Sequence, residues 1–225
     1  MWTRSELKSK AKIAFKANYW ISVLAALIIA FFTGGGSASS GRNASQDASG
    51  LDKINPLFIL SIVGAILAVS LLFYIIKIVV GNALIVGAKK AFVLNETSDE
   101  KPDFKTLITV FKSGEWVNVA IVMFLRNLII GLMTLLFIIP GIVFAYRYKM
   151  IPYILAEDPS VKWSEAKQRS IEMMNGQKWN AFVLDLSFIG WYLLSALTFG
   201  ILAIFYVSPY VEQTGAELYL ALKES

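Results

Sequence analysis

The sequence predicts an all-α fold, a polytopic bundle of about six transmembrane helices with amphipathic interfacial helices on the cytoplasmic side. Of the 225 residues, 56% are hydrophobic and only 16% are charged, whereas soluble domains carry about 25% charged residues. The hydrophobic residues also fall in long blocks, and a helix needs about 20 apolar residues to cross a bilayer. We therefore expect a single integral membrane domain over residues 1–225.

The chain contains no histidine and no cysteine. This composition removes the usual zinc and copper ligands, the cysteine nucleophile, disulfides and the commonest general base. We therefore expect no enzymatic activity, no metal site and no cofactor. The net charge is +5, but the lysines flank apolar blocks. Topology and anionic lipid explain them better than nucleic acid does.

Residues 1–18 are predicted to form a basic amphipathic helix. Thr3 and Glu6 have capping-box spacing, and apolar residues recur on one helical face. The apolar stretch Trp20–Phe32 that follows is the first predicted span. A cleaved signal peptide is the alternative, but the long, helically patterned charged region favours an uncleaved anchor.

Residues 34–56 are rich in Gly, Ser, Ala and Asn, which predicts a flexible outer loop. Leu57–Ile76 is the second predicted span, and Lys89 and Lys90 mark the interface beyond it. Between them runs a stripe of small residues that lets another helix approach closely: Ala83, Gly87 and Ala91.

Residues 102–113 are too short to span and predict a second interfacial helix, with its apolar face in the headgroup region or against the bundle. Trp116–Ile139 is the third predicted span and Ile142–Ala156 the fourth. The Pro140 and Gly141 pair between them is interpreted as a tight turn or helix break on the outer side. One long kinked helix is the alternative.

Asp158 and Pro159 have the pattern of a helix start, and the helix after them, ending at Gly176, is predicted to lie on the membrane surface. Its apolar face, including Trp163, is expected to contact lipid. Two further spans follow, Trp179–Leu197 and residues 200–211, joined by a tight turn at residues 198–200.

The distribution of cations predicts the topology. Residues 34–56 hold only Arg42 and Lys53, whereas the remaining loops and the N-terminal helix are rich in lysine. The positive-inside rule therefore places both termini in the cytoplasm and the chain in the cell membrane.

Four ionisable residues fall inside the apolar segments, and they form a candidate intramembrane charge network: Arg126, Arg147, Asp185 and Glu212. A charge at the centre of a bilayer costs at least about 2.5 kcal/mol, so such residues usually pair or line a wet cavity. Two are positive and two are negative, which predicts that each arginine is neutralised by an acid. Lys149 is expected to be interfacial. A functional pathway is the alternative to structural ion pairs.

Several segments resemble a family of bacterial integral membrane proteins, mostly from Gram-positive species, known as the domain-of-unknown-function 975 family. The resemblance rests on four segments in order, which together cover most of the chain: RSELKSKAKIAFKANYW, IIPGIVFAYRYKMIPYILAEDP, EAKQRSIEMMNGQKW and LSFIGWYLLSALTFGILAIFYVSPY. It implies a cytoplasmic-membrane protein of Gram-positive type. It implies no catalytic residues.

The leading functional hypothesis is a non-enzymatic accessory, regulatory or protective factor. It would bind anionic lipid at the cytoplasmic face or a membrane-protein partner through its amphipathic helices. The alternative is a small-solute or ion transporter or channel that uses the intramembrane charges. A water-filled cavity reaching Arg126 would favour the transporter. An intramembrane hydrolase with Asp185 and Glu212 as paired carboxylates ranks third.

Overall fold

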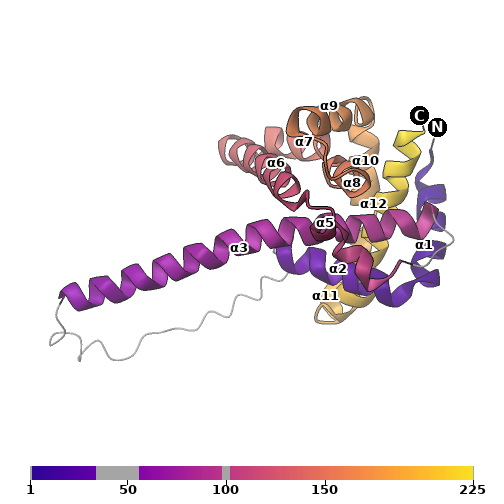
Figure 1. Ribbon diagram of the computed structural model, residues 1–225. Helices are drawn as coiled ribbons and strands as arrows, with labels where there is room; N and C mark the ends of the chain where they lie inside the picture. Colours follow the sequence, from indigo (N-terminus) through magenta and orange to yellow (C-terminus); the bar gives the residue numbers. More distant parts are fainter. Residues whose placement is uncertain (1, 34–55, 98–101, 225) are drawn as a thin grey trace.

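The computed structural model describes residues 2–33, 56–97 and 102–224, and every regular element within them is helical (Figure 1). The predicted all-α class is therefore confirmed for this part of the chain. The predicted outer loop, residues 34–56, lies outside the described residues except for Pro56, which begins a helix.

The predicted N-terminal amphipathic helix is α1 (Arg4–Ala17), which Thr3 caps by accepting a hydrogen bond from the Glu6 N–H at 3.3 Å. Its apolar face is buried and packs against α12 (Ser208–Lys223). The chain then bends by 108° into the apolar α2 (Tyr19–Thr33). If α2 crosses the membrane, this bend makes α1 lie nearly parallel to the membrane surface.

The centre of the fold is the C-terminal half of α3 (Pro56–Thr97), a helix of 42 residues whose N-terminal half extends away from the other helices (Figure 1). The small residues Ala83, Gly87 and Ala91 are all buried. A Cβ on Gly87 would overlap the backbone carbonyl of Leu107. The close approach predicted for this stripe is therefore confirmed.

Residues 102–113 form two short helices, α4 (Phe104–Leu107) and α5 (Thr109–Lys112), instead of one. Both pack against α3 and bury Leu107 and Val110. The sequence leaves two environments open for the apolar face of this segment, the headgroup region or the helix bundle. The structure shows it packed against the bundle.

Helices α6 (Trp116–Leu136) and α7 (Ile138–Arg147) form a hairpin. The chain turns at Phe137, which has an extended backbone, and Gly141 packs directly against Thr134. A chain reversal close to the predicted position is therefore confirmed and a single kinked helix is wrong, but Pro140 and Gly141 are themselves helical. The turn lies just before Pro140, which occupies the first turn of α7.

The predicted fourth span, Ile142–Ala156, is not one continuous helix. Helix α7 has ten residues, about 15 Å, and ends at Arg147. After a turn, the chain continues as α8 (Ile151–Glu157), whose first six residues are all buried and which packs against α3. The apolar character of Ile151–Ala156 therefore reflects burial in the protein core.

Helix α9 (Trp163–Met173) follows a turn in which Asp158 accepts hydrogen bonds from the Ser160 hydroxyl and N–H. These bonds lower the pKa of Asp158. The helix packs against α6 and α8, and the ring of Trp163 lies 5.7 Å from that of Tyr148. Trp163 is half-buried by this packing, and its contact with lipid stays a prediction.

The C-terminal segment comprises α10 (Lys178–Leu186), α11 (Ile189–Leu197), a π-helix η2 (Ala203–Val207) and α12. Between α11 and η2 the chain reverses at Phe199 and Gly200, both of which have positive φ, so the predicted turn is confirmed. In the described ranges, two stretches are long and apolar enough to span a membrane, α6 and Lys178–Leu197, with a third if α1 and α2 count as one bent span. That is fewer than the six predicted.

Gly141 provides a test of the α6–α7 hairpin. Gly141→Ala should lower the free energy of unfolding by about 1–3 kcal/mol, because its Cβ would overlap Thr134. The matched control is Gly131→Ala on α6, where a Cβ meets nothing within 4 Å. That variant should be neutral or gain up to about 1 kcal/mol from helix propensity. Thermal unfolding in detergent compares the two, and equal stability would contradict the hairpin.

Candidate functional site: a charged network between helices α3, α8, α10 and α12

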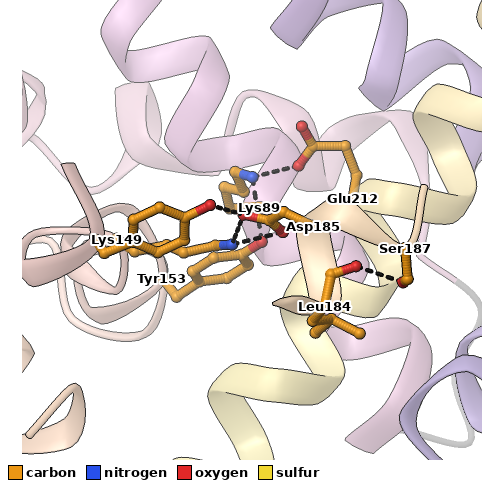
Figure 2. A network of polar contacts seen from close by, with 8 residues as sticks. Lys89, Lys149, Tyr153, Leu184, Asp185, Ser187 and Glu212 are labelled. Atoms are coloured by element: carbon orange, nitrogen blue, oxygen red, sulfur yellow. Dashed lines mark hydrogen bonds and ion pairs between the residues drawn. The ribbon is translucent and has the colours of Figure 1, made fainter. Parts of the chain in front are cut away.

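Three polar side chains from separate helices meet beside α3 (Figure 2). Lys89 of α3 forms an ion pair with Glu212 of α12 and donates a hydrogen bond of 3.1 Å to the hydroxyl of Tyr153 on α8. The side chains of Lys89 and Glu212 are only 13% and 19% exposed. A charge so buried is costly unless it is paired, so Lys89 and Glu212 are held together. With the bond to Tyr153, their contact links α3, α8 and α12.

The local packing explains how Tyr153 reaches Lys89. Gly215 of α12 faces the Tyr153 hydroxyl, and a Cβ at that position would overlap it. On the other side, the ring of Tyr153 stacks on that of Tyr219, with centroids 5.4 Å apart. The Tyr153 ring also carries the Lys89 ammonium 4.7 Å from its centroid, an arrangement that favours the cation.

A second ion pair lies alongside the first. Lys149, in the turn between α7 and α8, contacts the carboxylate of Asp185 on α10 at 2.6 Å. The Tyr146 hydroxyl donates a hydrogen bond of 2.8 Å to the same carboxylate. These side chains are more exposed, at 22% for Lys149 and 39% for Asp185. Solvent therefore screens this pair more than the Lys89–Glu212 pair.

Both ion pairs line one cavity of about 340 Å³, together with Tyr153 and Tyr192. The cavity wall presents two ammonium groups and two carboxylates, so its formal charge is balanced. Such a wall can hold water or a zwitterion, or exchange a partner of one ion pair for a ligand. No group of three or more acidic side chains in the described residues is positioned to hold a metal ion.

The two arginines of the predicted network lie elsewhere. Arg126 donates hydrogen bonds of 2.9 Å to the Tyr148 carbonyl and to the Asn127 side chain. Arg147 places its guanidinium 5.7 Å from the Phe144 ring, and its Nε is buried without a hydrogen-bond partner. Arg126 does not line the cavity.

The predicted pairing of Arg126 and Arg147 with Asp185 and Glu212 is therefore wrong. Lysines take the place of the arginines in the structure. The sequence pattern identifies the two acids from their position in apolar segments, whereas it predicts an interfacial position for Lys89 and Lys149. One signal was available for Lys89, because Ile85 and Val93, four residues away on either side, are apolar and share its helical face.

Residues 133–225 match a family model described as "Protein of unknown function (DUF975)". The resemblance is thus confirmed over this part of the chain. The matched part contains Lys149, Tyr153, Asp185 and Glu212, whereas Lys89 lies before it. No curated protein and no solved structure matches the chain. The family description names no activity, so the function must be argued from the structure.

The Lys89–Glu212 pair can be tested by a double-mutant cycle. Lys89→Met or Glu212→Leu alone should lower the free energy of unfolding by about 3–5 kcal/mol, because each leaves a buried charge without its partner. The double variant should recover much of that loss. Thermal unfolding in detergent measures all three.

The matched comparison is the Lys149–Asp185 pair, where Asp185→Leu should cost only about 1 kcal/mol because the side chain is more exposed. Additive losses in the Lys89 and Glu212 double variant would contradict a coupled pair.

Proposed function

We propose that this chain is a non-enzymatic, multi-pass protein of the cell membrane that binds anionic lipid at the cytoplasmic surface through α1. In this role it acts as an accessory, regulatory or protective factor, and a membrane-protein partner can occupy the apolar flanks of its helices.

The outward face of α1 carries this proposal. Lys12, Lys16 and the apolar Ile13, which is 72% exposed, lie on the exposed part of α1. Trp20, at the start of α2, is 76% exposed. Cations next to exposed apolar groups are typical of a helix lying at a membrane interface. The 108° bend into α2 orients α1 for this position.

Exposed apolar side chains at two helix–helix turns support insertion into a membrane. At the α6–α7 turn, Leu135 to Ile139 are between 65% and 83% exposed, and at the other turn Phe199 is 98% exposed. Such surfaces are unfavourable in water and favourable in lipid. Both termini lie close together, with α1 against α12 (Figure 1). Their proximity supports the proposal that both termini lie on the same side of the membrane, in the cytoplasm.

A small-solute or ion transporter is the second candidate, because the cavity beside the two ion pairs provides a polar site among apolar helices. Arg126 does not line this cavity, so this cavity is not the water-filled path to Arg126 that would favour the transporter. Ion flux into proteoliposomes distinguishes the two candidates. Flux that disappears in Glu212→Gln would replace the lipid-binding proposal with transport.

The proposed topology can be tested by cysteine labelling, because the chain has no native cysteine. Single cysteines at Ser45 and Thr198 should react with an impermeant thiol reagent on intact cells, because both positions are proposed to lie outside. Cysteine at Ser164, exposed on α9, should react only after the cells are lysed. Labelling of Ser164→Cys on intact cells would reject the orientation.

The lipid proposal predicts a loss of bound lipid when the charge of α1 is reduced. Lys12→Gln with Lys16→Gln should remove most of the anionic phospholipid that co-purifies with the protein, measured by mass spectrometry of the extracted lipid. The matched control, Lys105→Gln with Lys112→Gln, removes two exposed lysines from α4 and α5. An equal loss in both double variants would show a general charge effect and contradict a site on α1.

A further inference from the structure

A second cavity, of about 640 Å³, lies between α1, the C-terminal end of α3 and α12. It is separate from the network around Lys89. Its charged lining is predominantly acidic, with four glutamates and one lysine. Its titratable residues and its one tryptophan are Glu6, Lys10, Glu96, Glu217, Glu224 and Trp2.

Two of the glutamates form a carboxyl pair. Glu217 is only 5% exposed, and its Oε1 is buried without a hydrogen-bond partner. Glu96 accepts a hydrogen bond of 2.7 Å from the Gln213 side-chain amide and is also hydrogen-bonded to Glu217. Two carboxyl groups can bond to each other only if they share a proton. The pair therefore holds at least one proton.

The surroundings of this pair explain why it retains the proton. Burial, a hydrogen bond to Glu217 and repulsion between the two carboxyl groups raise the pKa of Glu96 to about 9. The one cation in the cavity lining, Lys10, lowers that pKa but is already paired with Glu6 at 3.4 Å, and both of these side chains are more than half exposed. Glu224, exposed at the end of α12, adds further negative charge. The pair thus lacks a dedicated counter-cation in the described residues.

Trp2 gives an independent indication of a ligand. Its indole Nε1 is buried without a hydrogen-bond partner, and the residue lines the same cavity as Glu217. The cavity lining therefore includes an unused donor and an aromatic ring at Trp2, and an unused acceptor at Glu217. An aromatic ring in an acidic cavity suits an organic cation, because ring faces and carboxylates both attract positive charge.

We propose that this cavity binds a small organic amine, whose ammonium group takes the place of the proton shared by Glu96 and Glu217. Its volume far exceeds that of a metal ion, and no group of three acidic side chains in the described residues is arranged to hold one. On binding, the ammonium enters with its charge, the shared proton leaves to solvent, and the two carboxylates share the cation.

The experiment is calorimetric titration of the full-length protein in detergent with putrescine, with 1,4-butanediol as the uncharged ligand of matched length. Putrescine should bind and the diol should not. Because each bound amine releases one proton, the affinity should rise about tenfold per pH unit between about pH 6 and 8. Titrations in two buffers of different ionisation enthalpy should show this proton release.

Glu217→Gln should weaken putrescine binding at least tenfold and remove its pH dependence, and Glu96→Gln gives a second test if the first variant does not fold. The matched control, Glu224→Gln, removes an exposed carboxylate of the same cavity and should change affinity less than twofold. Unchanged binding in Glu217→Gln, or no binding by the wild-type protein, would overturn the proposal. Displacement of putrescine by Mg²⁺ at equal concentration would also overturn it, because the site would then be a metal site.

Discussion

The close packing of other helices on the C-terminal half of α3 is the constraint on which the rest of the structure depends. Helices α2, α4, α8 and α12 all contact α3. Along α3 the buried residues Ala83, Gly87 and Ala91 have small side chains or none. At Gly87 the backbone of Leu107 occupies the space where a side chain would be. Helix interfaces with small residues bring backbones together, which increases the van der Waals contact between them.

This packing also determines the chemistry at Lys89. Because α8 and α12 lie directly against α3, the ammonium of Lys89 is enclosed by Tyr153 and Glu212 and is largely removed from solvent. Removing two charges from water is costly, and the ion pair must offset that cost with good geometry and additional hydrogen bonds. Tyr153 supplies such a bond, and Gly215 leaves room for its hydroxyl.

The protein presents two kinds of polar site with different electrostatic character. The cavity beside Lys89 and Lys149 has balanced charges, since each carboxylate has an ammonium partner. The cavity at Glu96 and Glu217 has an excess of carboxyl groups, and burial raises the pKa of Glu96. The first arrangement stabilises helix contacts whether or not a ligand is present. The second leaves an oxygen of Glu217 and a nitrogen of Trp2 unsatisfied, and unsatisfied buried groups are more costly than paired ones.

The amphipathic helices show how local patterns and tertiary packing differ in what they determine. The apolar faces of α1 and α9 follow from helical periodicity, and both helices are present. Whether such a face contacts lipid or protein depends on which surface lies next to it, and in both helices that surface is another helix of this chain. Periodicity describes one helix at a time and contains no information on its neighbour.

The sequence by itself determined the helical class, the Thr3 cap, the close packing at Gly87 and the chain reversals near Pro140 and Phe199. Each of these follows from contacts between residues near one another in the chain or from the absence of a side chain. Only the tertiary structure decided the partners of Asp185 and Glu212 and the division of residues 142–156 into α7 and α8. Charge balance required cations near the two acids, but lysines and arginines meet that requirement equally. The selection depends on which residues the packing of α3, α8, α10 and α12 brings within reach, and that distance is not encoded in local sequence.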